Sequence, residues 1–181
     1  MQTSQKWVLA ILAVLLLAIG TFAAINIVGW QNRDAPTHLF GFTKNDVAVE
    51  IALKKYSPER LELLATFTPT REHFHLYSKD LPRDGLAGLG RPTLLEVRSP
   101  SDVIRLTGPL TANQPPRELY YKTLDVSFPV YPEGAVTLSQ PFAWTGKMDA
   151  VELSVTYMAC SDQTCLAPVI DKRFTAKFPR P

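Results

Sequence analysis

The sequence has no excess of charge of one sign and no run of lysine or arginine. Its 19 basic and 17 acidic residues leave a formal net charge of +2, whereas domains that bind nucleic acid concentrate positive charge on one face. A nucleophile elbow and a glycine-rich phosphate loop are also absent, and only 3 histidines are present. We therefore expect no nucleic-acid partner and no cofactor, and we see little support for an enzyme built on either motif.

Helical periodicity is equally scarce, and the chain has no internal repeat or low-complexity tract. Its 181 residues allow one domain plus a short appendage, because single domains usually run about 100 to 150 residues. The 15 prolines stand among many β-branched and aromatic residues, which favours short strands joined by tight connections over a helical bundle. The predicted fold class is all-β.

One long hydrophobic run, residues 7–30, differs in kind from the rest of the chain. As a helix its 24 residues would be about 36 Å long, enough for the roughly 30 Å core of a bilayer, whereas the apolar part of a signal peptide has about 7 to 15 residues. We predict one N-terminal transmembrane helix within residues 1–30; the alternative is a signal segment cleaved after Ala23. Lys6 precedes the run, so the positive-inside rule puts residues 31–181 outside the cytoplasm either way.

Alternation of apolar and polar residues with a period of two begins after residue 45 and recurs to the end of the chain. We therefore predict a linker over residues 31–45 and one β-sandwich domain over residues 46–181. Strands are predicted at residues 47–53, 61–67, 73–77, 93–98, 102–106, 124–130, 135–138, 150–158 and 170–178. Residues 78–92 and 107–122 lack alternation and are predicted to be long loops, which often carry function.

The only two cysteines, Cys160 and Cys165, lie between the predicted strands at 150–158 and 170–178. Counting by parity from each strand puts both side chains on the polar, solvent-facing side. Side chains on one face of adjacent antiparallel strands have Cα atoms about 4.5 to 5.5 Å apart, which is within the span that a disulfide accepts. The spacing therefore permits a disulfide across a four-residue hairpin loop, although a bulge near Ala159 would reverse the parity.

A structural staple is the plain interpretation of such a pair in an exported domain. The chain-entropy estimate gives roughly 2 kcal/mol for a loop of about six residues and about 4 to 5 kcal/mol for a loop near one hundred, so a purely stabilising bridge would be better placed elsewhere. A solvent-facing pair in a short hairpin is also accessible to thiolate exchange. A reversible dithiol/disulfide is the favoured interpretation, and the inert staple is the alternative.

Three blocks of sequence add a more specific signal. Around the pair, a strand ends in Tyr-x-x-Cys and is followed by a short polar loop with Asp, a second Cys and a nearby Pro. The blocks lie at residues 155–168, at 74–78 with 90–93, and at 126–131 with 134–137. Their order and distances resemble the N-terminal periplasmic domain of the thiol:disulfide interchange protein DsbD, of the disulfide bond corrector family, in a stand-alone membrane-anchored form. The resemblance covers residues 45–178.

The resemblance implies an immunoglobulin-like sandwich that relays electrons between thioredoxin-like donor and acceptor proteins, an activity of the thiol:disulfide oxidoreductase or protein-disulfide reductase type. It also implies a periplasmic domain held at the inner membrane, with disulfide isomerases and cytochrome c biogenesis factors as recipients. By position Cys165 matches the cysteine that bonds to partners, and Cys160 the one that resolves the mixed disulfide. A membrane electron channel cannot fit in this chain, so a separate membrane donor is expected.

The family shields its cysteines with a cap loop that carries an acidic and an aromatic residue. Residues 117–122 resemble this cap, although a leucine stands where a phenylalanine is expected. Two further residues match strand aromatics beside the pair, and the alternative for these two is an ordinary surface side chain. The candidate residues of the cap and its surroundings are Glu118, Leu119, Tyr120, His75 and Tyr77.

Metal binding is a competing interpretation from another class. His73 and His75 are predicted to share one strand face, and with Met158 and the two cysteines they would offer the soft ligands that copper prefers. The sequence does not bring these groups together, so no metal site is assigned. A third alternative is a structural or assembly module with an inert disulfide.

Overall fold

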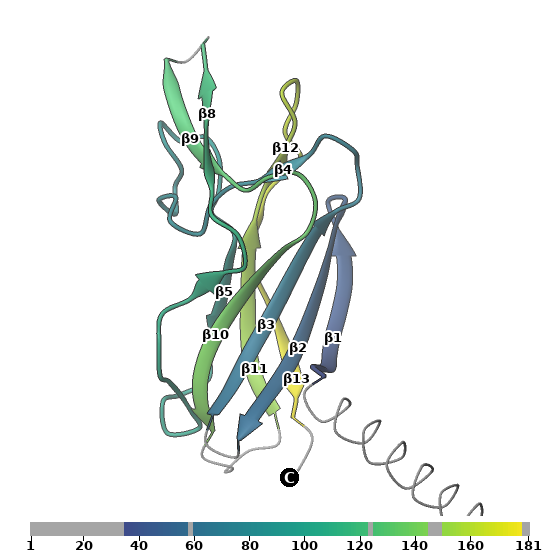
Figure 1. Cartoon of the computed structure of the whole chain (residues 1–181), viewed down its shortest axis with the longest axis vertical. Helices are drawn as coiled ribbons and strands as arrows, with labels where there is room; N and C mark the ends of the chain where they lie inside the picture. The colour runs from purple at the N-terminus through teal and green to yellow at the C-terminus, as the bar shows by residue number, and fades with distance from the viewer. Residues whose placement is uncertain (1–34, 58–59, 123–124, 145–149, 179–181) are drawn as a thin grey trace, which may run out of the picture. The chain divides into compact units, whose positions relative to one another are not determined.

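The computed structural model describes residues 35–57, 60–122, 125–144 and 150–178, and every regular element among them is a β-strand (Figure 1). From Pro36 onward these residues belong to one compact unit. The predicted all-β class is therefore confirmed for the described residues. The transmembrane helix predicted over residues 7–30 lies outside them, and among the residues described no helix is long and apolar enough to cross a bilayer.

A large antiparallel sheet forms one layer of this unit. Its strands follow the order β1-β2-β3-β10-β6, and β7 also pairs with β10. Their bounds are Thr37–Lys44 (β1), Val47–Ser57 (β2), Arg60–Pro69 (β3), Val136–Trp144 (β10), Ile104–Leu106 (β6) and Thr111–Ala112 (β7). The strands predicted at residues 47–53 and 61–67 are both present and pair with each other, since Val49 stands opposite Phe67 and Leu53 opposite Leu63.

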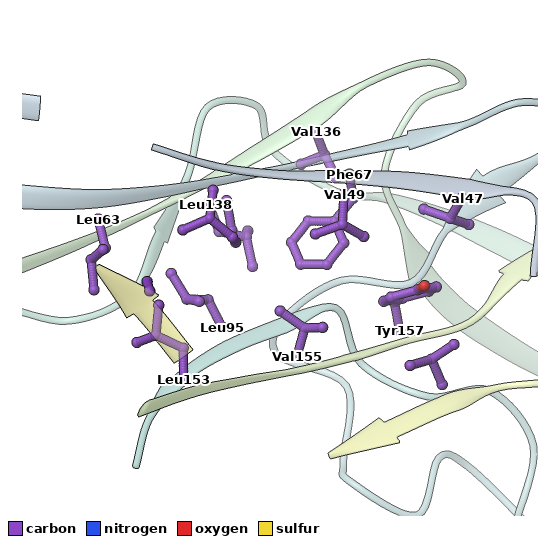
Figure 2. Close-up of a cluster of buried hydrophobic side chains, with 14 of the residues drawn as sticks. Val47, Val49, Leu63, Phe67, Leu95, Val136, Leu138, Leu153, Val155 and Tyr157 are labelled. Carbon is purple, nitrogen blue, oxygen red and sulfur yellow. The ribbon is translucent and has the colours of Figure 1, made fainter. Parts of the chain in front are cut away.

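A second, three-stranded sheet in the order β13-β11-β5 forms the other layer. The bounds of its strands are Val169–Lys177 (β13), Ala150–Tyr157 (β11) and Leu94–Val97 (β5). Alternate side chains of both sheets pack into one hydrophobic core, and Figure 2 shows Val49, Phe67 and Leu138 lying across from Leu153 and Val155. Burial of each such side chain contributes about 1.5–3 kcal/mol, so the period-two pattern leads directly to a two-layered β-sandwich.

Two segments that lack alternation nevertheless contain strands. Most of the expected linker, residues 31–45, is occupied by β1, whose Phe40 ring stacks on Phe174 of β13 with centroids 4.8 Å apart. The predicted loop over residues 107–122 contains β7 and a further strand, β8 (Arg117–Tyr121), so that part of the loop prediction is wrong. β1 pairs with the strand that follows it, β2, whereas β7 pairs with the distant β10. Long-range pairing of this kind, and packing such as the Phe40–Phe174 stack, cannot be read from a local pattern.

Four short strands build one end of the sandwich. β4 (His75–Leu76) pairs with β12 (Ala159–Cys160), and β8 forms a hairpin with β9 (Val126–Val130). The two pairs are connected, because the backbone N–H of Tyr131 donates to the carbonyl of Leu76 at 2.8 Å. Figure 1 shows the β8–β9 hairpin and the turn after β12 projecting at this end.

A bulge in β13 upsets the parity count that was used for the cysteines. Val155 pairs with Lys172, and Tyr157 pairs with Val169. Two steps along β11 thus correspond to three steps along β13, so β13 contains one extra residue. As a result Val169 is buried, while Ile170, which has the parity of the apolar Phe174 and Ala176, is 59% exposed. The side on which Cys165 lies therefore cannot be found by counting alternate residues back from β13, because the bulge lies between them.

Candidate functional site

The two cysteines face each other across a tight hairpin. Cys160 ends β12, the chain turns through Ser161–Thr164, and Cys165 returns opposite Cys160 with their Cα atoms 4.0 Å apart and their sulfurs bonded. The N–H of Ser161 donates to the carbonyl of Thr164 at 2.8 Å, and the Ser161 hydroxyl accepts from the N–H of Gln163 at 3.3 Å. The predicted disulfide across a four-residue loop is confirmed.

The environments of the two sulfur-bearing residues differ sharply. Cys165 is exposed, whereas Cys160 is 0% exposed. The prediction that both cysteines face solvent is therefore wrong for Cys160. The reason is tertiary: a small cluster of apolar side chains from separate segments, centred on Tyr77, Phe128 and Val130, packs around Cys160 and excludes water. A nucleophile from solution can reach only one half of the disulfide.

Tyr77 makes the direct polar contact with the buried half. Its hydroxyl donates a hydrogen bond to Cys160 Sγ at 3.3 Å, and the side chain is only 3% exposed. Burial, followed by the neighbouring Tyr121 phenol, raises the pKa of Tyr77 well above its ordinary value. The phenol therefore stays protonated and remains a hydrogen-bond donor at every physiological pH.

Gly90 permits the close packing around Tyr77. Gly90 has φ 77°, in the left-handed region, and a Cβ atom there would lie 3.1 Å from both the Tyr77 ring and the Leu81 side chain. The hydroxyl of Thr93 donates to the Tyr77 carbonyl at 2.7 Å. The two sequence blocks at 74–78 and 90–93 are therefore in contact: Gly90 packs against the ring of Tyr77, and Thr93 bonds to its backbone.

An apolar pocket of about 150 Å³ opens beside Cys165. Besides Cys165 it is lined by Tyr77, Leu89, Gly90, Tyr121, Phe128 and Met158. Leu89, at its rim, is 44% exposed. The exposed half of the disulfide therefore adjoins an apolar hollow that an approaching protein would cover.

The predicted cap segment reaches the site with alternate side chains. Leu119 and Tyr121 of β8 pack against the cluster that contains Cys160. Glu118 and Tyr120 are exposed, and the Tyr120 hydroxyl donates to Asp125 at 2.8 Å instead. Because neighbouring residues in a strand point to opposite faces, the structure brings only Leu119 of these three candidates next to the cysteines. Tyr121, which was not among them, takes the aromatic position.

His75 lies beside Cys160 on the neighbouring strand. The two residues are directly opposite partners in the β4–β12 pair, and His75 is 2% exposed. Its Nε2 atom is buried without a hydrogen-bond partner among the described residues. Burial is the largest influence on the imidazole and lowers its pKa. The alternative of an ordinary surface side chain is therefore wrong for His75, and likewise for the buried Tyr77.

The two histidines predicted to share a strand face do not. His73 has φ 63°, which breaks the extended run before β4 begins, and its Nδ1 lies 3.3 Å from Glu133 on the surface. His75 is buried, so the two side chains diverge. Over residues 35–178, leaving out the undescribed gaps, no group of three His, Cys, Asp or Glu side chains is placed to hold a metal ion.

Two site residues were missed by sequence reasoning, and a third, Met158, was considered only as a copper ligand. Phe128, Tyr121 and Met158 all contact the cysteine cluster. Phe128 and Met158 lay within the quoted sequence blocks, which was the available signal, but nothing local distinguished them from core residues. The Tyr121 ring packs edge-on against Phe128 with centroids 5.5 Å apart, and burial raises the pKa of its phenol.

This geometry is suited to one-sided attack on a disulfide. A thiolate can approach Cys165 Sγ from solvent, and breaking the S–S bond would release the Cys160 sulfur into a site that already holds a hydroxyl donor at 3.3 Å. A thiolate leaves more readily when a hydrogen bond stabilises its charge.

Comparison with known proteins reveals a shared fold. No family model and no curated protein sequence matches the chain. The N-terminal periplasmic domain of ScsB from Proteus mirabilis superposes with a TM-score of 0.52 at 11% identity, over 79% of this chain and 52% of that one. The reduced N-terminal domain of DsbD from Neisseria meningitidis matches with a TM-score of 0.46 at 16% identity, over 73% of this chain and 85% of that one. The resemblance to DsbD-type N-terminal domains expected from the sequence is confirmed at the level of the fold.

Proposed function

We propose that this domain carries out thiol:disulfide exchange through Cys160 and Cys165. The observation that carries the proposal is the asymmetry of the pair: Cys165 is exposed beside an apolar pocket, whereas Cys160 is buried and accepts a hydrogen bond from Tyr77. Attack is thereby directed to the Cys165 sulfur, and the hydrogen bond from Tyr77 stabilises the Cys160 sulfur as the leaving group. A bond that only stabilised the fold would need neither feature.

The exchange proceeds in two balanced steps. A partner thiolate attacks Cys165 Sγ, the Cys160–Cys165 bond breaks, and Cys160 leaves with the electron pair and then takes up a proton. A second thiolate of the partner then attacks the partner's own sulfur in the mixed disulfide and expels the Cys165 thiolate. The partner is oxidised to a disulfide, and the pair is reduced to a dithiol. When the dithiol meets an oxidised acceptor, the same steps run in reverse, with Cys165 as attacking nucleophile.

We infer that the partners are thioredoxin-like proteins and that the domain works in the periplasm. The shared fold with ScsB, whose domain is described as periplasmic, and the sequence blocks around the cysteines support this inference. The two-sheet sandwich supports the immunoglobulin-like type expected from the same resemblance. We further propose that residues 1–30 anchor the domain in the inner membrane, and that a separate membrane protein supplies the electrons. Cytochrome c biogenesis factors are proposed among the recipients.

The reduction potential decides between exchange and an inert staple. We expect the full chain, equilibrated with glutathione or dithiothreitol redox buffers, to have a midpoint between about −120 and −270 mV, the range of exchange proteins. Quantifying the free thiols by mass after alkylation measures it. A midpoint below about −300 mV would identify a structural bond and would rule out the exchange function.

Replacing Tyr77 with phenylalanine tests how the leaving sulfur is stabilised. The change removes the hydroxyl that donates to Cys160 Sγ and keeps the ring. Because a hydrogen bond to a charged group contributes about 1.5–3 kcal/mol, we expect reduction by dithiothreitol to slow about 10- to 100-fold. Stopped-flow measurement at constant pH gives the rate constant.

Tyr157→Phe is the matched control for this variant. It removes another buried phenol hydroxyl, which donates to the carbonyl of Lys44 at 3.0 Å, away from the cysteines. We expect its reduction rate to stay within about two-fold of the wild type. Equal rates in the two variants would contradict a role for the Tyr77 hydroxyl.

A further inference from the structure

A second polar side chain lies beside Cys160, and disulfide exchange as described above does not yet use it. His75 stands directly opposite Cys160 in the β4–β12 pair, and directly opposed residues of antiparallel strands project from the same face with Cβ atoms about 4.5–5.5 Å apart. Its ring also packs edge-on against Tyr77, with centroids 6.0 Å apart. His75 therefore lies on the same face as Cys160, and its ring contacts the ring of the tyrosine that donates to the Cys160 sulfur.

The burial of this imidazole requires an explanation. Its Nε2 atom has no hydrogen-bond partner among the described residues, and the side chain is 2% exposed. An unpaired buried polar atom destabilises the folded protein, and an apolar ring of similar size would avoid that loss. A buried imidazole on the position opposite Cys160, whose sulfur must gain and lose a proton, can accept and donate that proton.

We propose that His75 transfers the proton that Cys160 gives up when the disulfide closes and takes up when it opens. This inference rests on the proposed exchange function. On closure, the Cys160 thiol transfers its proton to the imidazole, the resulting thiolate attacks Cys165 Sγ in the mixed disulfide, and the partner leaves as a thiolate. On opening, the Cys160 thiolate is released and receives a proton through the imidazole, which takes up one proton from solvent as it gives one to the thiolate and so ends neutral. Atoms and charge balance in both directions.

The charged groups around His75 are compatible with this role. Burial is the largest influence on the imidazole and lowers its pKa. Asp162 from the hairpin turn raises this pKa, Arg117 from β8 lowers it, and Glu133 from the segment after β9 raises it. The imidazole is therefore neutral in the disulfide form at neutral pH and free to accept a proton. A protonated histidine in this site could not act as the base.

The test follows closure of a mixed disulfide in the full chain. Reduced protein reacts with Ellman's reagent at the exposed Cys165 and releases one thionitrobenzoate; attack by Cys160 then releases the second. We expect His75→Gln, which keeps hydrogen-bonding capacity but does not titrate near neutral pH, to slow the second release at pH 7 roughly 100-fold. The first release should change less than about three-fold, because Cys165 performs it. His73→Gln, the same change at the exposed histidine, should leave both phases at the wild-type rate.

The pH profile of the second release separates proton transfer from a structural role. In the wild type, the second release should rise with pH until His75 is neutral and then level off, at the midpoint found for that imidazole by NMR titration. In His75→Gln it should climb about tenfold per pH unit through the neutral range, because Cys160 must then ionise unaided. Equal rates in His75→Gln and His73→Gln, or a wild-type profile that climbs through the His75 midpoint without levelling, would overturn the inference.

The same traces distinguish failure of this inference from failure of the exchange function. If the second thionitrobenzoate is released at equal rates in the wild type and in both variants, the cysteine pair still performs exchange, and only the role of His75 is ruled out. A wild-type chain that stops at the first release does not close its disulfide, and both proposals are then overturned.

Discussion

Replacing Cys160 with alanine in the full chain is expected to yield a protein that stays covalently bound to a thioredoxin-like partner through Cys165. The reason is that Cys165 is exposed and can form the mixed disulfide, while the residue that would resolve it is gone. A suitable probe is a thioredoxin-like protein with its second active-site cysteine replaced by alanine and its first activated with thionitrobenzoate. Non-reducing electrophoresis measures the yield and rate of the adduct.

Cys165→Ala is the matched control, because it also leaves one cysteine. Its remaining thiol, on Cys160, is 0% exposed beneath the cluster around Tyr77 and Phe128. We expect the adduct to form at least about 10-fold more slowly than with Cys160→Ala, since exchange requires in-line access to the sulfur. Adduct formation at equal rates would contradict the assignment of Cys165 as the partner-binding cysteine, and absence of an adduct in both variants would contradict the exchange function.

Truncation of Phe128 to alanine should uncover the buried sulfur. Phe128 is 2% exposed, and its ring packs edge-on against Tyr77 and Tyr121, each with centroids 5.5 Å away. Removing a buried phenylalanine costs about 3–5 kcal/mol. Because the cluster around Cys160 is small, we expect much of this loss to appear as local opening at the cysteine end.

The measurement is alkylation of Cys160 in the reduced protein, followed by mass spectrometry of its peptide. We expect Phe128→Ala to raise the rate of alkylation at least about 10-fold, which corresponds to about 1.4 kcal/mol of easier local opening. Phe142→Ala is the control, because Phe142 is 0% exposed and packs 5.6 Å from Phe178 in the main core. It should destabilise the domain by a similar amount, measured by denaturant unfolding, without speeding alkylation in the folded state. Equal acceleration in both variants would contradict local shielding by Phe128.

The main sandwich was predictable because its signal is local. In β2 and β3, every second residue is apolar over a long stretch, and those residues are the ones buried between the sheets. The two partners are also adjacent in the sequence, so the hairpin follows from the break between them. β1 and β8 also pair with the next strand along the chain. They carry weak apolar patterns, however, and packing such as that of Phe40 on Phe174 cannot be read from adjacent residues.

The site was predictable to a smaller extent. Spacing of the cysteines predicted the disulfide, and the sequence blocks identified Tyr77 and His75 as neighbours, which their contacts with Cys160 now explain. Parity placed Cys160 in solvent, because it counts positions along one strand and takes no account of what covers that strand. Sequence also ranked Glu118 and Tyr120 with Leu119, whereas strand alternation turns the first two away.

By itself, the amino-acid sequence determined the strand periodicity, the β-sandwich and the pairing of two cysteines five positions apart. These features depend on residues that are close in the chain or on a repeat of two. Only the tertiary structure decided that Cys160 is buried while Cys165 is exposed. It also placed the phenol of Tyr77 against the buried sulfur and His75 on the strand position opposite Cys160. Burial is a property of what packs against a residue, and here the covering groups come from segments as distant in the sequence as Tyr77, Tyr121 and Phe128.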